Sequence, residues 1–283
     1  MRILATLALF AATLSAQKLK IEVMVSPDSG YAAASTIISG QRDAILIDPQ
    51  FAKSEAKKVA AAIKASGKNL TTVYISHGHP DHYFGLAVMK EEFPNAKLVA
   101  LPDVVPAIER GWAGRREFWY PTYGEELPSA TPVLPTALAK PELTLEGETF
   151  PITGGVTGDG PGNTFVWIPS LKAVVAGDII FNQVHFGQPA DNTAWEASFA
   201  KLEALKPEMV IGGHSKIGVK HGPEVISWMR QYTKDFRAWK AESKSADELK
   251  KKVLAKYPSL GMPSILDRET TAAFAPPAPP KGK

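Results

Sequence analysis

The 283-residue chain contains no cysteine. It therefore has neither a disulfide nor a thiolate metal ligand, so its stability must come from its core, and any metal ion must be held by nitrogen and oxygen atoms. The same absence excludes a cysteine nucleophile and a cysteine that could carry a lipid.

The chain also has little excess charge, since 32 basic and 29 acidic residues give a formal net charge of +3. No dense basic run accompanies this excess, so the sequence gives no reason to expect a nucleic-acid partner. With 45% hydrophobic and 22% charged residues, the composition is that of a globular protein that can bury a sizeable core. Length alone does not distinguish one large domain from two small ones.

Long apolar runs are missing except at the N-terminus. There Arg2 precedes an apolar run over residues 3–14 and then small residues, a pattern typical of a secretory signal. We expect residues 1–16 to be a signal peptide and the mature protein to begin at Gln17. The run is short for a membrane span, so we expect an exported protein, periplasmic or secreted, with no membrane attachment after cleavage. The alternative is a buried N-terminal helix.

The predicted secondary-structure elements follow the order of an α/β protein. Strands are expected at 18–23, 36–39, 43–47, 72–76 and 97–101, and in a second series at 143–145, 164–168, 173–176 and 208–211. Helices are expected at 54–65, with Ser54 as N-cap, and at 84–93, 193–205 and 223–243. Strands that alternate with helices in this way favour the α/β class.

Two regions lack a regular pattern. Residues 103–142 are interrupted by glycine and proline and concentrate aromatic side chains, namely Trp112, Phe118, Trp119, Tyr120 and Tyr123. These aromatics form either a small hydrophobic cluster under a long loop or a lid over a functional site. The tail, 273–283, is rich in proline and is predicted to be disordered.

Three of the six histidines lie within six residues, in the segment His77-Gly78-His79-Pro80-Asp81-His82. This segment directly follows the strand predicted at 72–76. In extended backbone, side chains two residues apart point the same way, so His77 and His79 can bind one cation together. After the chain turns, Asp81 and His82 can face a second cation.

Further ligands follow two later strands. Asp178 comes after the strand at 173–176, and His214 comes after the strand ending at 211 and two glycines, which allow close approach of the backbone. A single histidine is usually a surface or core residue, but this combination of polar residues at strand ends predicts a metal site. His185, in a loop beyond Asp178, either lines the pocket or lies on the surface.

The histidine cluster resembles the signature of the metallo-β-lactamase superfamily, over about residues 20–220. The resemblance implies a four-layer αβ/βα sandwich as one domain, 17–272. It also implies that His77 and His79 bind the first zinc ion, that Asp81, His82 and His214 bind the second, that Asp178 bridges both, and that Asp48 supports the site without binding metal.

One position departs from the family pattern, which supplies a third histidine to the first metal. Here the chain reads Gly158-Asp159-Gly160-Pro161-Gly162-Asn163-Thr164. An alignment without gaps in the next strand puts Asp159 at the position of the histidine, and an alignment on Gly-x-Thr puts Asn163 there. We favour Asp159. A carboxylate binds zinc and suits Fe or Mn better than imidazole does, and it makes a bound water less acidic.

The chemistry that the resemblance implies is hydrolysis by metal-activated water, with two zinc ions as the expected cofactors and Fe or Mn as alternatives. Asp81 would orient the nucleophile and carry a proton. We expect an exported hydrolase of a small-molecule ester, lactone or related bond. Alternatives are a β-lactamase without a cysteine ligand, a mononuclear iron oxygenase acting on a sulfur compound, and a degenerate binding protein without turnover. The sequence does not indicate the substrate or the oligomeric state.

Overall fold

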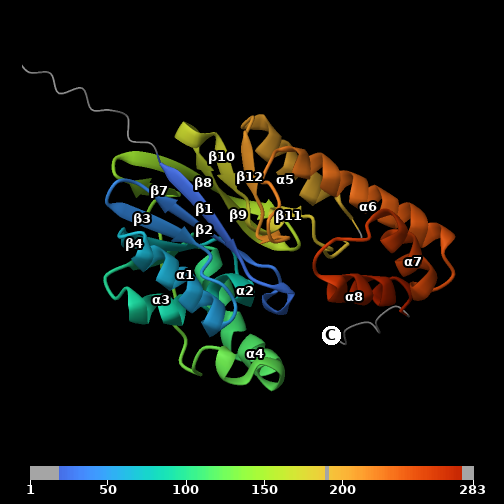
Figure 1. The fold of residues 1–283 in the computed structure, drawn as a ribbon, viewed down its shortest axis with the longest axis horizontal. Helices are drawn as coiled ribbons and strands as arrows, with labels where there is room; N and C mark the ends of the chain where they lie inside the picture. The colour runs from blue at the N-terminus through green and yellow to red at the C-terminus, as the bar shows by residue number, and fades with distance from the viewer. Residues whose placement is uncertain (1–18, 189–190, 276–283) are drawn as a thin grey trace, which may run out of the picture.

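The computed structural model describes residues 19–188 and 191–275 (Figure 1). The predicted signal, residues 1–16, lies outside the described residues, as does the predicted tail beyond Ala275. The described start of that tail belongs to a helix that ends at Phe274. Among the described residues no helix combines the length and the apolarity that a membrane crossing requires.

The N-terminal half forms a six-stranded mixed sheet in the order β1-β2-β3-β4-β5-β6. Its strands are β1 (Lys20–Val25), β2 (Ala34–Ser39), β3 (Asp43–Ile47), β4 (Asn69–Ile75), β5 (Lys97–Ala100) and β6 (Thr136–Ala137). The first two pairings are antiparallel and the other three are parallel. The parallel strands all end at one edge of the sheet, where the loop after β4 begins.

The second half forms a five-stranded mixed sheet in the order β12-β10-β9-β8-β7. Its strands are β7 (Glu142–Leu145), β8 (Glu148–Thr157), β9 (Pro161–Ile168), β10 (Ala173–Val175) and β12 (Met209–Ile211). A parallel pair, β11 (Phe181–Asn182) with β13 (His214–Ser215), forms a separate two-stranded sheet. Because β10 and β12 run parallel, the residues that follow them emerge on the same side.

Side chains along β9 alternate between two cores, because successive residues of a strand face opposite sides of the sheet. Val166 and Ile168 lie in the core shared with the first sheet, whereas Phe165 and Trp167 pack into the core beneath the later helices. The second sheet is therefore covered on both faces. This confirms the predicted αβ/βα sandwich.

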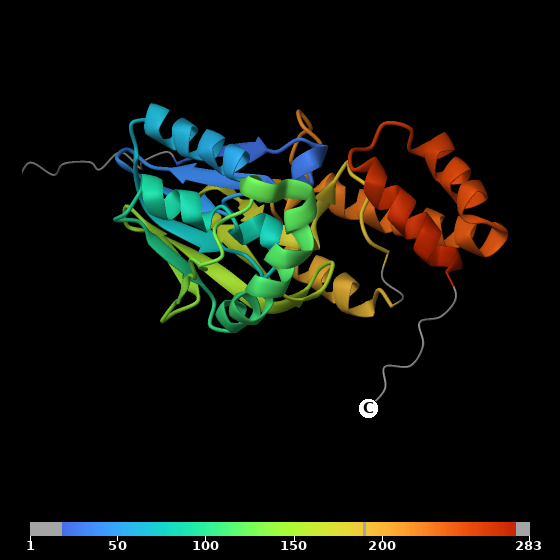
Figure 2. The ribbon, with the colours of Figure 1, turned by 90° about the horizontal axis from the view of Figure 1, so that it is seen from below.

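Helices form the two outer layers (Figures 1 and 2). Against the first sheet pack α1 (Lys53–Ala65) and α3 (Leu86–Glu92), and the short α2 (Pro80–Tyr83) precedes α3. Against the second sheet pack α5 (Thr193–Ala204) and α6 (Glu224–Glu242). The chain ends in α7 (Ala246–Lys256) and α8 (Pro263–Phe274), which lie beside α6 at one end of the molecule.

The expectation of an irregular segment at 103–142 is wrong over its first half. Val104–Tyr123 forms α4, a 20-residue helix. Pro106 lies in the first turn, where the missing N–H has no helical partner to lose, and Pro121 lies in the last turn. Pro121 has no N–H to donate, so one helical hydrogen bond is lost, but the loss lies close to the C-terminal end of the helix.

Other elements also differ from expectation. Helix α1 begins at Lys53 after Ala52, so Ser54 is not its N-cap. Strand β8 was not predicted, and neither were α7 and α8. A signal for α7 was nevertheless present, because Ser245 and Glu248 form the Ser-x-x-Glu pattern that begins many helices, and the Ser245 hydroxyl accepts a hydrogen bond from the Glu248 amide.

Candidate metal centre

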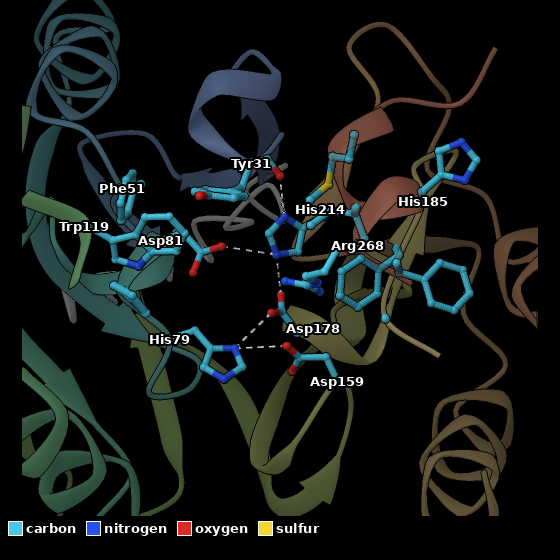
Figure 3. A pocket seen from close by; sticks show the side chains of 16 residues that line it. Tyr31, Phe51, His79, Asp81, Trp119, Asp159, Asp178, His185, His214 and Arg268 are labelled. Atoms are coloured by element: carbon cyan, nitrogen blue, oxygen red, sulfur yellow. Dashed lines mark hydrogen bonds and ion pairs between the residues drawn. The ribbon is translucent and has the colours of Figure 1, made fainter. Parts of the chain in front are cut away.

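Seven His and Asp side chains meet at the cavity. Figure 3 shows the ones that line it, namely His79, Asp81, Asp159, Asp178 and His214. They form two groups, in each of which the potential ligand atoms all lie within 4.8 Å of one another. The first group is His77, His79, Asp159 and Asp178, and the second is Asp81, His82 and His214. The structure thus brings together all seven predicted ligand residues.

The end of β4 positions His77 and His79. His77 and His79 flank Gly78 in the connection between β4 and α2. His79 then occupies the N-cap position of α2 and Pro80 its first turn, where a proline is favoured. The helical turn rotates Asp81 and His82 away from the preceding histidines and toward the second group.

Asp178 lies between the two groups. Its Oδ2 atom is 3.1 Å from His77 Nε2 and 3.5 Å from His79 Nδ1. Its Oδ1 atom is 3.1 Å from His82 Nε2 and 3.3 Å from His214 Nε2. One carboxylate therefore offers one oxygen to each group, which is the geometry of a bridging ligand.

The glycine before His214 permits this arrangement. A Cβ atom on Gly213 would lie 2.1 Å from Asp178 Oδ1, so no other residue fits there without displacing the carboxylate. The His214 ring is then fixed on two sides. It stacks on Phe181 with an interplanar angle of 6°, and its Nδ1 lies 2.6 Å from the Tyr31 carbonyl oxygen, which directs Nε2 to the second group.

Asp159 enters the first group from the turn between β8 and β9. Its Oδ2 atom is 3.1 Å from His79 Nδ1, and its backbone N–H donates to the Asp178 carbonyl at 3.0 Å. Asn163 instead donates from Nδ2 to the Gly160 carbonyl at 3.0 Å and belongs to neither group. The geometry thus favours Asp159 over Asn163 at the position of the third histidine.

Asp48 supports the second group by holding the imidazole of His82 on the side away from the ligand atom. Its carboxylate accepts hydrogen bonds from the Ser76 amide at 2.8 Å and the Ser76 hydroxyl at 2.6 Å. The other imidazole nitrogen of His82, Nδ1, lies 2.9 Å from Asp48 Oδ2, so the proton on Nδ1 leaves Nε2 as the ligand atom. Asp48 itself adopts a left-handed backbone with φ of 58° at the end of β3.

Several ligand atoms have no hydrogen-bond partner within the described residues, although they are buried. These are Nε2 of His77, Nε2 of His82 and Oδ1 of Asp178. Buried polar atoms are rarely left without a partner, and these three converge on common points at distances suited to a shared cation. The donor set of imidazoles and carboxylates fits zinc and also harder divalent metals.

The carboxylates of the site also favour the binding of cations. Burial alone would lower the pKa of His79, but hydrogen bonds to Asp159 and Asp178 and the charges of these carboxylates raise it to about 10. Burial would raise the pKa of Asp178, but the surrounding histidines hold it well below its usual value. With Asp48 and Asp81, four carboxylates lie at the site, and divalent cations bound there would supply positive charge beside them.

A cavity of about 340 Å³ opens in front of the two groups. Its walls are largely apolar and aromatic, and they include Tyr31, Phe51, Trp119, Phe181, Phe186 and Ile265. Trp119 comes from α4, so this helix forms a wall of the pocket. Both interpretations of the aromatic segment apply in part, because Trp112 is buried in the core whereas Trp119 lines the cavity.

His185 is a buried residue that lines the same cavity, not a surface histidine. Its Nδ1 lies 2.7 Å from the Tyr232 hydroxyl, and it belongs to neither metal-binding group.

Three lining residues from α8 and its N-cap, Met262, Ile265 and Arg268, were not predicted. Their spacing of three residues places them on one face of a helix, but only the docking of α8 brings that face to the cavity.

Comparison with known proteins gives one family match. The model of the metallo-beta-lactamase superfamily matches residues 29–214. Hydroxyacylglutathione hydrolase 1 from Vibrio vulnificus (strain YJ016) is 36% identical over 62 residues, which are 22% of this chain and 24% of that protein. The match thus spans about a quarter of the length of this relative.

Solved structures share the fold at low sequence identity. A metallo-beta-lactamase family protein from Thermus thermophilus superposes with a TM-score of 0.62 and 17% identity, covering 90% of this chain and 91% of that chain. A metallo-beta-lactamase from Pontibacter korlensis gives a TM-score of 0.58 and 14% identity, covering 78% of this chain and 97% of that chain. The mono-zinc form of the metallo-beta-lactamase FIM-1 from Pseudomonas aeruginosa superposes with a TM-score of 0.53 and 15% identity, covering 76% of this chain and 90% of that chain.

Proposed function

Because the chain belongs to the metallo-beta-lactamase superfamily and its seven ligand residues form two metal-binding groups, we propose that it is a dinuclear zinc hydrolase of a small-molecule ester, lactone or related bond. The observation that carries the proposal is the position of Asp178, whose two oxygens lie within 3.5 Å of ligand nitrogens in both groups. The coarser conclusion, a His/Asp metal site in a hydrolase of this superfamily, does not depend on which metal binds.

When bound, two cations would make water a nucleophile near neutral pH and stabilise the charge that develops on the scissile group. His77, His79 and Asp159 would hold one ion, His82 and His214 the other, with Asp178 between them and Asp81 beside the second. Asp81 lines the cavity, and its Oδ2 lies 3.4 Å from His214 Nε2. Although burial would raise the pKa of Asp81, His82 and His214 hold it below its usual value, so this carboxylate is ionised and can orient a nucleophilic water by accepting a hydrogen bond.

The cavity walls favour an acyl compound with an apolar body. Aromatic side chains from β11, α4 and the N-terminal segment surround the space in front of the metal-binding groups. They exclude water from the bound substrate and position it without adding charge. The similarity to a hydrolase named for hydroxyacylglutathione, although limited to 62 residues, supports hydrolysis of an acyl compound.

A second candidate has one observation in its favour. The first group contains two carboxylates, Asp159 and Asp178, and carboxylates suit iron and manganese better than imidazole does. A single iron bound there would support oxygenase chemistry instead of hydrolysis. The two proposals differ in metal content, since the first requires two ions per chain and the second requires one iron.

The test combines metal analysis with substrate profiling of protein purified without added metal. We expect two zinc ions per chain and turnover of members of a panel of aryl esters, lactones and β-lactams. His82→Ala and His214→Ala should each remove about one ion and lower activity by about 100-fold or more. His221→Ala is the matched control, because His221 lies outside both groups. Unchanged metal content in both variants, or a loaded protein inactive on the whole panel, would contradict the proposal.

A further inference from the structure

The cavity has a wall that the family match does not include. The matched segment ends at residue 214, whereas α8 begins at Pro263. Met262, Ile265 and Arg268 nevertheless line the cavity together with the metal-binding residues (Figure 3). This wall therefore belongs to the C-terminal helices of this chain, and its chemistry bears on which substrate the chain selects.

Hydrogen bonds hold α8 in place just before its first turn and near its middle. Just before the helix, the Gly261 amide donates to the Gln183 carbonyl at 3.0 Å, and the His185 amide donates to the Gly261 carbonyl at 2.9 Å. Within the helix, Glu269 accepts from the Gln188 amide at 2.9 Å. The segment that carries His185 and Phe186 into the cavity is thus tied to α8, so the position of Arg268 is fixed by the fold.

Arg268 is the only lysine or arginine among the residues that the structure places around this cavity. Its Nε and Nη2 atoms lie 3.3 Å and 3.2 Å from Glu269 Oε1, so one edge of the guanidinium faces that carboxylate. Within the described part of the chain, Nη1 has no hydrogen-bond partner. The side chain is 65% exposed, which leaves this end of the group open to a ligand.

We propose that Arg268 is a specificity-determining residue that binds a carboxylate of the substrate, while Met262 and Ile265 contact its apolar body. The substrate is then an acyl compound with an apolar portion and a carboxylate remote from the bond that is cleaved. A carboxylate fits better than a phosphate, because the planar guanidinium matches it and one cation already paired with Glu269 cannot balance a doubly charged group. This inference rests on the proposed hydrolase function.

The kinetic test compares two esters that differ in one charge. The 4-nitrophenyl monoester of glutaric acid carries a free carboxylate, and the 4-nitrophenyl ester of glutaramic acid carries a neutral amide in its place. We expect Arg268→Ala to raise KM for the charged ester about tenfold with little change in kcat, and to leave the neutral ester unaffected. Arg268→Lys should keep part of the preference, and added salt should reduce it in the unaltered protein.

The matched control is Lys251→Ala, which removes one positive charge from the exposed surface of the neighbouring helix α7. It should leave both KM values unchanged. Equal KM values of the unaltered protein for the two esters would overturn the inference, as would a preference for the charged ester that survives in Arg268→Ala. Either result leaves the hydrolase proposal intact, because turnover has then been observed.

A binding measurement decides the question even if neither ester is cleaved, a result that would count against the hydrolase proposal. Calorimetric titration of the metal-loaded protein with 3-phenylpropanoate should give a Kd about tenfold lower than titration with 3-phenylpropanamide. Arg268→Ala should remove this difference. If the difference persists in the variant, the carboxylate is bound elsewhere, the metal ions included, and the assignment to Arg268 is wrong.

Discussion

Asp48 Oδ2 and His82 Nδ1 lie 2.9 Å apart, and the same carboxylate is held by the amide and hydroxyl of Ser76. Ser76 is also hydrogen-bonded to His77, because its hydroxyl lies 3.0 Å from His77 Nδ1. Asp48 and Ser76 therefore orient one histidine of each metal-binding group. A buried pair at the ends of β3 and β4 thus supports a histidine in each of the two metal-binding groups.

The support by Asp48 can be tested with Asp48→Asn. The amide keeps the shape of the side chain but loses the charge and one acceptor atom, so His82 is oriented less firmly. We expect the affinity for the second metal ion to fall about 10- to 100-fold, measured by competition with a chromogenic chelator. Asp43→Asn, on the partly buried Asp43 at the start of β3, serves as control. Equal affinities in Asp48→Asn and the unaltered protein would show that Asp48 has no such role.

The unusual ligand of the first group can be tested with Asp159→His. The variant restores a third imidazole beside His77 and His79, and imidazole suits zinc better than it suits manganese. We expect the ratio of zinc to manganese affinity to rise about tenfold or more in competition titrations. Asn163→His is the comparison, because that side chain points to the Gly160 carbonyl. A rise in Asn163→His and none in Asp159→His would favour the alternative alignment.

Helix α4 contacts the metal site through Arg115, whose Nη1 donates a hydrogen bond to the Gly78 carbonyl between His77 and His79. Arg115→Met removes this bond to the ligand loop, so we expect metal affinity of the first group to fall several-fold while the fold remains. The matched control is Arg116→Met, since Arg116 donates to the Pro128 carbonyl at 2.7 Å, away from the site. The same loss of affinity in both variants would point to a general effect of α4 on stability.

His185 should make the protein sensitive to mild acid. Burial lowers its pKa to about 4, only partly offset by Asp267 and Asp28, whereas in the unfolded chain the pKa is about 6.5. The folded state then binds fewer protons than the unfolded state between these values. Its stability is complete above about pH 6.5 and falls as the pH drops toward 4, by at most about 3 kcal/mol.

Denaturant unfolding at a series of pH values in this range measures the effect. His185→Gln should show a smaller loss of unfolding free energy between pH 6.5 and 4 than the unaltered protein. His221→Gln is a second test of the same argument and should also show a smaller loss, because burial lowers the pKa of His221 as well. An identical pH dependence in His185→Gln and the unaltered protein would mean that His185 does not titrate in this way.

Four of the candidate ligand residues, His77, His79, Asp178 and His214, could be predicted from the sequence because they follow predicted strands. Asp81 and His82 lie beside the first histidines in the chain, so a local pattern was sufficient. Asp159 was harder, since its place depends on how its turn packs against Asp178. A Cβ atom on Gly158 would lie 2.3 Å from the Asp178 carbonyl oxygen. No sequence pattern predicts that the two segments approach each other so closely.

Arg268 could not be predicted as a cavity residue, because its position depends on contacts between segments distant in the chain. The backbone of Gly261 bonds to Gln183 and His185, roughly 80 residues away, and only this docking turns α8 toward the metal site. Helix α4 was not predicted because its local sequence is misleading. Its glycines and prolines argue locally against a helix, whereas burial of Ile108 and Trp112 in the core stabilises one.

Each metal-binding group takes side chains from both halves of the sandwich. The first sheet contributes His77 and His79 to one group and Asp81 and His82 to the other, while the second half contributes Asp159 and Asp178 to the first and His214 to the second. Neither half contains a complete group. During biosynthesis, the ligand set is therefore complete only after residue 214 has been translated and the halves have docked, so full metal loading is a late event. Metal ions bound in the two groups would link the two halves of the sandwich to each other.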